Sequence, residues 1–173
     1  MPTVTITDET GIPKGLMDSL EAHTGQGRLH KAFSVYVFRK NRTEILIQQR
    51  SEKKMLWPLI WANTCCSHPR ENETPTDAGE RRLKEELGFT TGLSPVSDFV
   101  YRAEDPSGRG VEHEHVTILI GDCDDAGIHP NPDEVAAFQW IAVTELLDDM
   151  KKNPDRYAPW FHLGLSLITH NEK

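Results

Sequence analysis

The sequence has little cysteine, no excess of positive charge and no long apolar run. Its three cysteines, two of them adjacent at Cys65 and Cys66, make a poor disulfide framework for a chain of 173 residues. The net charge of −8 argues against nucleic-acid binding through a general basic surface. No apolar run could span a membrane, and the first residues lack the pattern of a signal peptide. We therefore expect a cytoplasmic protein with reduced thiols that binds neither nucleic acid nor membranes.

The composition and the order of elements predict a single α+β domain. The chain is 37% apolar, which is enough to bury a core, and no repeat or linker divides residues 1–173. Strands come first, then one central helix, more strands and two closing helices, an order typical of a mixed β-sheet between helices. The expected strands are 3–7, 32–38, 44–50, 61–66, 96–103, 111–120 and 134–143, and the expected helices are about 16–22, 75–87, one beginning near Thr144, and 155–170.

The central helix is the best specified of these elements. Thr74 can cap its N-terminus, Pro75 suits the first helical position, and Gly88 suits the position just after its last turn.

Two arginine–glutamate pairs on this helix allow two interpretations. Arg81 with Glu85 and Arg82 with Glu86 are four residues apart, a spacing at which opposite charges stabilise a helix. Alternatively, Glu86 could hold a magnesium ion while Arg82 faces an anionic oxygen of a diphosphate. Charge counting does not decide between them.

The segment VEHEHV contains two carboxylates that should point the same way. A strand has a side-chain period of two, so Glu112 and Glu114 share a face and would repel each other unless a proton or a cation lies between them. His23, His30 and His68 could complete a metal site, and this donor mixture suits zinc, manganese or iron. The alternative is that the scattered histidines are ordinary surface residues and that EHEH belongs to a polar edge strand.

Cys66 has a similar ambiguity, because a free cysteine in an apolar strand is often an inert core residue. Neighbours on a strand point to opposite faces, so Cys66 shares its face with His68 and not with Cys65. Taken singly, the aromatics Tyr101 and Trp160 suit a core, and the cations Arg50, Lys54 and Arg82 suit a solvated surface.

Residues 67–89 resemble a degenerate Nudix box. The residues that fall in register are Glu73, Arg81, Glu85, Glu86 and Gly88. Ser67 replaces the first glycine of that pattern, and Arg82 replaces a glutamate. The second change removes a carboxylate used by Nudix hydrolases, which counts against hydrolysis.

The flanking segments resemble the type I isopentenyl-diphosphate isomerase family, which has the Nudix fold. They are HTGQGRLHKAFSVYVF, WPLIWANTCCSHP, YRAEDPSG, VEHEHV and YAPW, in that order from His23 to Trp160. The resemblance implies an isomerase of isoprenoid precursor synthesis that interconverts isopentenyl and dimethylallyl diphosphate. It also implies a small isoprenyl diphosphate as the binding partner, and we expect a monomer or a weak homodimer.

The resemblance implies a role for each candidate residue. The metal ligands would be His23, His30, His68, Glu112 and Glu114 for Mn²⁺ or Zn²⁺, with Glu86 for a Mg²⁺ ion on the diphosphate. The catalytic residues would be Cys66 and Glu114, assisted by Tyr101. The substrate contacts would be Trp160 on the hydrocarbon and Arg50, Lys54 and Arg82 on the diphosphate.

One position departs from the family and two other functions compete. The family usually has a lysine where this chain has Ser19, and Lys14 or Arg28 could compensate for it. A Nudix hydrolase of nucleoside or other diphosphates would release phosphate or a monophosphate. A noncatalytic metal- or diphosphate-binding module would not need the acid–base set of Cys66 and the strand glutamates.

Overall fold

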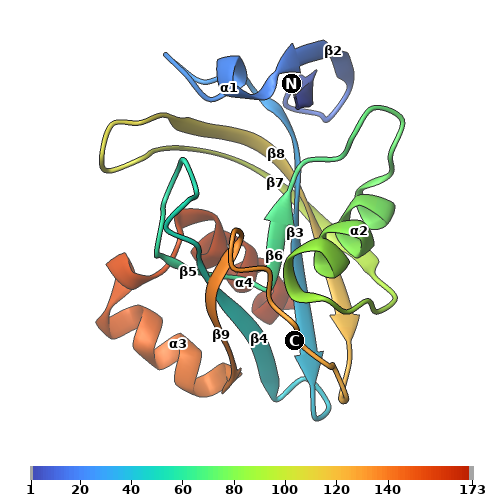
Figure 1. The fold of residues 1–173 in the computed structure, drawn as a ribbon, viewed down its shortest axis with the longest axis vertical. Coiled ribbons are helices and arrows are strands. Elements are labelled where there is room, and N and C mark those ends of the chain that lie inside the picture. Colours follow the sequence, from blue (N-terminus) through green and yellow to red (C-terminus); the bar gives the residue numbers. More distant parts are fainter. Residues whose placement is uncertain (1, 172–173) are drawn as a thin grey trace.

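The computed structural model describes residues 2–171, and over these residues nine strands form one mixed, curled sheet accompanied by four α-helices (Figure 1). The strands are β1 Thr3–Thr7, β2 Pro13–Asp18, β3 His30–Arg39, β4 Glu44–Arg50, β5 Trp61–Ala62, β6 Cys65–Ser67, β7 Ser94–Glu104, β8 Val111–Asp122 and β9 Val135–Ala142. The helices are α1 Ser19–Ala22, α2 Pro75–Leu87, α3 Val143–Lys152 and α4 Pro159–Asn171, with a 3₁₀ turn at Pro154–Arg156.

Strand β3 is the axis of this sheet. It runs parallel to β8, with His30 opposite Glu114 at one end and Phe38 opposite Asp122 at the other. It is antiparallel to β6, and its last residues form a hairpin with β4. A parallel partner requires a long crossover connection, and here the crossover includes α2.

Both faces of β3 are buried, which confirms the predicted sheet between helices. Its alternate side chains enter two separate apolar clusters, one with α2 and the other with α3 and α4 (Figure 1). The α2 cluster contains Phe33, Val35, Val37, Leu83 and Leu87, and the other contains Tyr36, Phe38, Leu146, Phe161 and Leu165. A strand buried on both faces can present a functional side chain only near its end or where the helical cover is incomplete.

The helix from Pro75 is confirmed with its Thr74 cap, whose hydroxyl accepts a hydrogen bond from the Asp77 amide at 3.1 Å, and Gly88 adopts the left-handed conformation after it. Three other expectations were wrong. Residues 13–18 form β2 on β1, so α1 is a single turn. The expected strand 61–66 is divided into β5 and β6, and α4 begins at Pro159 because residues 154–156 form the 3₁₀ turn.

Two exclusions drawn from the sequence can be compared with the structure. Among the described residues, none of the helices is long and apolar enough to cross a membrane. Cys65, Cys66 and Cys123 are all free thiols.

Gly164 on α4 lies directly against the buried Tyr36 ring. A Cβ atom at this position would lie 2.0 Å from the Tyr36 hydroxyl oxygen. Tyr36 is fully buried, so its hydroxyl cannot turn toward solvent, and among the described residues this hydroxyl has no hydrogen-bond partner. The absence of a side chain at position 164 therefore determines how closely α4 approaches β3.

Gly164→Ala should lower the free energy of unfolding by up to about 2 kcal/mol, because an overpacking cost of ~1–3 kcal/mol opposes the ~1 kcal/mol that alanine contributes to helix stability. Urea unfolding measures the change. In a Tyr36→Phe background the loss should shrink, since the clashing oxygen is gone. Gly92→Ala is the control, because a Cβ atom there meets nothing within 4 Å. An equal effect at both glycines would contradict the assigned contact.

Candidate active site

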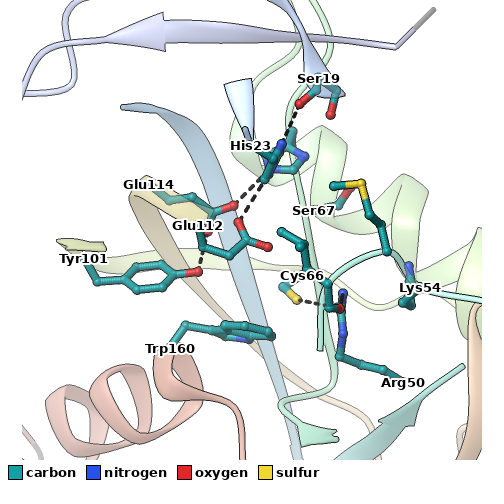
Figure 2. A pocket seen from close by; sticks show the side chains of 13 residues that line it. Ser19, His23, Arg50, Lys54, Cys66, Ser67, Tyr101, Glu112, Glu114 and Trp160 are labelled. Carbon is teal, nitrogen blue, oxygen red and sulfur yellow. Dashed lines mark hydrogen bonds and ion pairs between the residues drawn. The ribbon is translucent and has the colours of Figure 1, made fainter. Parts of the chain in front are cut away.

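A cavity of about 260 Å³ opens beside the first half of β3 (Figure 2). It contains most of the residues expected to be functional, drawn from separate strands, loops and helices. They are His23, Arg50, Lys54, Cys66, His68, Tyr101, Glu112, Glu114 and Trp160, together with Ser19, Met55, Leu56 and Ser67.

Strand register places Glu114 between two of its partners. His30 on β3 and Tyr101 on β7 both stand directly opposite Glu114 of β8. Directly opposed residues on neighbouring strands are the closest cross-strand neighbours. The Tyr101 hydroxyl donates a hydrogen bond of 2.9 Å to Oε2 of Glu114, and Oε1 of Glu114 lies 3.6 Å from Nε2 of His30.

His23 reaches the same place from the loop after α1. Its carbonyl accepts a 2.8 Å hydrogen bond from the Val111 amide at the start of β8. The contact requires Gly110, because a Cβ atom there would lie 2.6 Å from the His23 carbonyl oxygen. His68 follows Cys66 by two residues, just beyond the end of β6, and lines the same cavity.

Five side chains converge as a candidate metal site. One potential ligand atom from each of His23, His30, His68, Glu112 and Glu114 lies within 4.8 Å of all the others. The sequence predicted this group, and the structure brings all five together.

The hydrogen bonds behind the cluster turn its ligand atoms inward, toward one another. Nδ1 of His23 lies 2.6 Å from the Ser19 carbonyl oxygen, and Nδ1 of His30 lies 2.6 Å from the Arg28 carbonyl oxygen. A carbonyl accepts only, so both Nδ1 atoms carry a proton and both Nε2 atoms face inward, as in metal-binding histidines. In the described part of the chain, Oε2 of Glu112 is buried without a hydrogen bond and lies 3.3 Å from Nε2 of His23. A buried carboxylate oxygen in this position, among inward imidazole nitrogens, fits a cation.

The electrostatics of the cluster also favour positive charge. Burial disfavours a charged His23, but Glu112 outweighs it and raises the pKa of His23 to about 9. Burial lowers the pKa of His68 to about 4, although Glu114 opposes the change. Burial and the neighbouring Glu114 carboxylate raise the pKa of Glu112 to about 7. Burial alone would raise the pKa of Glu114, yet His30 and His68 hold it well below its usual value. Without a cation, a proton provides the compensating charge.

Cys66 occupies the other side of the cavity (Figure 2). It stands opposite Ser34 of β3, while Cys65 points into the cluster under α2, as the strand period predicted. Burial raises the pKa of the Cys66 thiol to about 12, and the Arg50 guanidinium, 3.9 Å from Sγ, opposes this rise. In the free structure the thiol is therefore protonated.

Trp160 lines the same cavity and has a neighbour on each of these two sides. Its ring centroid is 6.3 Å from that of Tyr101 and 5.4 Å from the Arg50 guanidinium carbon. Trp57 packs edge-on against it at 5.4 Å between ring centroids, and Trp160 is only 3% exposed. The indole is therefore held by neighbours that each restrict its movement.

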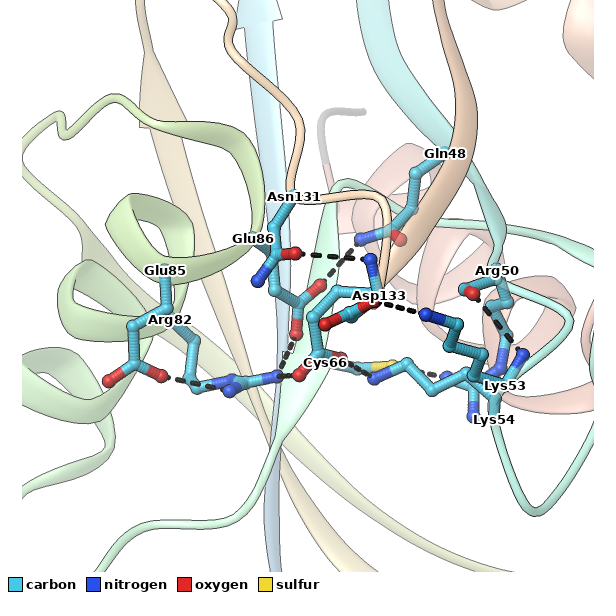
Figure 3. A network of polar contacts seen from close by, with 12 residues as sticks. Gln48, Arg50, Lys53, Lys54, Cys66, Arg82, Glu85, Glu86, Asn131 and Asp133 are labelled. Carbon is cyan, nitrogen blue, oxygen red and sulfur yellow. Dashed lines mark hydrogen bonds and ion pairs between the residues drawn. The ribbon is translucent and has the colours of Figure 1, made fainter.

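Glu86 and Arg82 lie outside the residues that line this cavity, in a polar network behind β6 (Figure 3). Glu86 is 2% exposed and accepts hydrogen bonds from Nη2 of Arg82 at 2.5 Å and from Nε2 of Gln48 at 2.9 Å. The second expected i,i+4 pair on α2 also forms: Nη1 of Arg81 lies 3.2 Å from Oε2 of Glu85. The carboxylate proposed to hold magnesium is thus already paired with a guanidinium.

Glu134 belongs to this polar network, and the sequence analysis did not identify it. It pairs with Lys54 and lies 3.2 Å from Nη2 of Arg82, so it joins two of the cations expected on the diphosphate. Nothing in the acidic connection between β8 and β9 distinguishes it in the sequence. Gln48 was missed for a similar reason, since it looks like any polar residue of a strand.

Ser19 lines the cavity where the family usually has a lysine. Lys14, one of the two suggested substitutes, instead pairs with Asp8 at 2.8 Å. Among the described residues that line the cavity, the lysine and arginine side chains are those of Lys54 and Arg50, and these two supply its permanent positive charge.

The fold and the sequence both match Nudix proteins. A model of the NUDIX domain family matches residues 28–161. A crystal structure of a Deinococcus radiodurans protein superposes with a TM-score of 0.70 at 17% identity, covering 87% of this chain and 90% of that chain. A MutT protein from Methanosarcina mazei superposes with a TM-score of 0.68 at 13% identity, covering 84% of this chain and 96% of that chain. The predicted Nudix-like α+β fold is confirmed.

Sequence relatives narrow the class. A protein from Halorhodospira halophila is 42% identical over 161 residues, 93% of this chain and 91% of its own length. A protein from Nocardia farcinica is 43% identical over 157 residues, which cover 91% of this chain and 89% of its own length. Both are named isopentenyl-diphosphate Delta-isomerase. The chain belongs to this isomerase family of Nudix proteins, as the resemblance of its motifs predicted.

Arg82→Met should lower the free energy of unfolding by about 3 kcal/mol, because it leaves the buried Glu86 carboxylate without its cation. Arg102→Met is a suitable control, since Arg102 pairs with the exposed Glu104 and such pairs contribute about 1 kcal/mol or less. Urea unfolding without substrate measures both variants. Equal losses would show that the Arg82–Glu86 pair is not the buried charge compensation described here.

Proposed function

We propose that this chain interconverts isopentenyl diphosphate and dimethylallyl diphosphate, for isoprenoid precursor synthesis. The observation that carries the proposal is that a thiol, Cys66, and a carboxyl group, Glu114, line one cavity together with the Trp160 indole (Figure 2). Moving a double bond requires one carbon to gain a proton while another loses one. Two proton-transfer groups on different sides of a substrate are suited to this task.

In this proposal Glu114 delivers a proton to one end of the alkene, with Tyr101 as its hydrogen-bond donor. Cys66, as thiolate, removes a proton from the carbon on the other side. The state between the two transfers resembles a tertiary carbocation, which the π face of Trp160 stabilises and shields from water.

The protonation states of the pair are consistent with reversible turnover. The free structure favours a protonated Cys66 and an ionised Glu114. The reactive form, with Cys66 as thiolate and Glu114 as carboxylic acid, carries the same number of protons. One turnover converts this reactive form into the protonated thiol and ionised carboxylate of the free structure. One proton transfer between the two sides of the cavity resets the pair.

Two kinds of cation belong to the proposal. His23, His30, His68, Glu112 and Glu114 would hold one Mn²⁺ or Zn²⁺ ion, which supplies a positive charge that tunes the carboxylate. Glu86 would hold a Mg²⁺ ion on the diphosphate, once Arg82 has moved from it. Arg50 and Lys54 line the cavity and would bind the diphosphate directly, with Arg82 as a further cation from the adjoining network.

The principal test is incubation of the pure protein with isopentenyl diphosphate and Mg²⁺, followed by detection of the acid-labile allylic product. Cys66→Ala should lower kcat by about 10²-fold or more, because a proton-transfer group contributes about 10²–10⁴-fold. Cys123→Ala, which removes a partly buried cysteine beside the other apolar cluster, should keep wild-type turnover.

Two results would exclude the isomerase proposal. One is the absence of allylic product from the wild type, and the other is undiminished turnover in Cys66→Ala. Release of phosphate or a monophosphate would instead support a Nudix hydrolase. The presence of Arg82 where Nudix hydrolases have a glutamate weighs against that second function, since it removes a carboxylate of the box.

His68→Gln should lower both the bound transition metal and the activity, with metal affinity reduced by about 100-fold or more. The measurement is metal content after loading with Mn²⁺ or Zn²⁺ and dialysis, alongside the product assay. His115→Gln is the matched control, because His115 lies on β8 but faces Gly11 on the opposite side of the strand. Full metal content in a triple variant of His23, His30 and His68 would refute the site.

A further inference from the structure

One buried amide connects the two walls of the cavity. Asn63 is 0% exposed and lies in the interruption between β5 and β6. Its Nδ2 donates hydrogen bonds to the carbonyls of Val35 at 3.0 Å and Cys65 at 2.8 Å. Its Oδ1 accepts a hydrogen bond of 3.1 Å from Nε1 of Trp160. An indole nitrogen can only donate, so the orientation of the amide is determined by its partners.

The three contacts join the indole to the strand that carries the thiol. Val35 and Cys65 are a paired position of β3 and β6, and the next residue of β6 is Cys66. Trp160 comes from α4, on a distant part of the sequence. Asn63 thus fixes the position of the ring relative to the backbone beside Cys66.

A polar anchor of this kind has a cost that core packing alone does not require. Burying an amide is unfavourable unless its hydrogen bonds are made, and an apolar side chain could fill the same space. The anchor does provide direction, because the hydrogen bond fixes where the indole N–H points. Packing against Trp57 and Tyr101 restricts the ring but does not select that orientation chemically.

We infer that Asn63 is a positioning residue that holds the Trp160 indole over the reacting carbons and thereby keeps water from the carbocation-like state. The inference rests on the proposed isomerase function. In the productive path, the cation loses a proton to Cys66 and becomes the alkene. In the competing path, a water oxygen bonds to the tertiary carbon and releases a proton, giving a tertiary alcohol diphosphate.

The ratio of the tertiary alcohol diphosphate to the allylic diphosphate tests this inference. Holoenzyme with isopentenyl diphosphate and Mg²⁺ is followed by NMR, which separates the tertiary alcohol diphosphate from the allylic diphosphate. Asn63→Ala should raise the ratio of alcohol to allylic product by about tenfold. It should lower kcat by up to about 10²-fold, the effect of displacing an active-site group by about 1 Å. KM should stay within about threefold of wild type, because the proposed diphosphate contacts are unchanged.

Thr64→Val is the matched control. The Thr64 hydroxyl accepts from the Val37 amide at 2.9 Å and donates to the Leu46 carbonyl at 2.6 Å, so this substitution also removes two buried hydrogen bonds from the same segment. Its product ratio should equal that of the wild type even where stability falls. Loss of folded protein lowers total turnover but does not alter the ratio of products.

The indole N–H gives a second readout that needs no substrate. Its ¹H–¹⁵N resonance is assigned by its disappearance in Trp160→Phe, and its hydrogen exchange should be slow in the wild type and at least tenfold faster in Asn63→Ala. Asn63→Ser serves if the alanine variant does not fold, since its short side chain does not reach the indole.

The outcomes separate the inference from the proposed function. A wild type that forms no allylic product refutes the function, and the exchange measurement still tests the hydrogen bond. A wild type that isomerises, with unchanged product ratio or unchanged N–H exchange in the Asn63 variants, overturns the inference alone. A raised ratio in Thr64→Val equal to that in Asn63→Ala would also overturn it.

Discussion

The parallel pairing of β3 with β8 is the constraint on which the rest of the site depends. It sets His30 beside Glu114, and the antiparallel pairing of β7 with β8 then sets Tyr101 on the other side of the same carboxylate. A shift of β8 by one residue would turn Glu112 and Glu114 to the opposite face of the sheet. His23 after α1 and His68 after β6 add to an arrangement that this register has already defined.

The parts of the fold that the sequence predicted are those governed by local chemistry. The Thr74 cap and the Gly88 stop determine α2 within a few residues of chain, and the period of two places Glu112 with Glu114 and separates Cys65 from Cys66. Motif resemblance predicted the family and the five residues that converge as a candidate metal site.

What the sequence did not reveal depends on tertiary partners. Residues 13–18 contain proline and glycine and are mostly exposed, so only pairing with β1 makes them a strand. The interruption at Asn63 and Thr64 is stable because their side chains replace the missing backbone hydrogen bonds. Glu134 matters through Lys54 and Arg82, which come from two other segments, and no local pattern indicates such a partnership.

The Arg82–Glu86 contact has a thermodynamic consequence for the order in which ligands bind. A cation that binds Glu86 must displace the guanidinium, and an anion that draws Arg82 away leaves the carboxylate available. Each event lowers the cost of the other, so the two bindings are positively coupled and the coupling is reciprocal. In the proposed complex, this network would therefore favour a neutralised anion–cation pair over either ion alone.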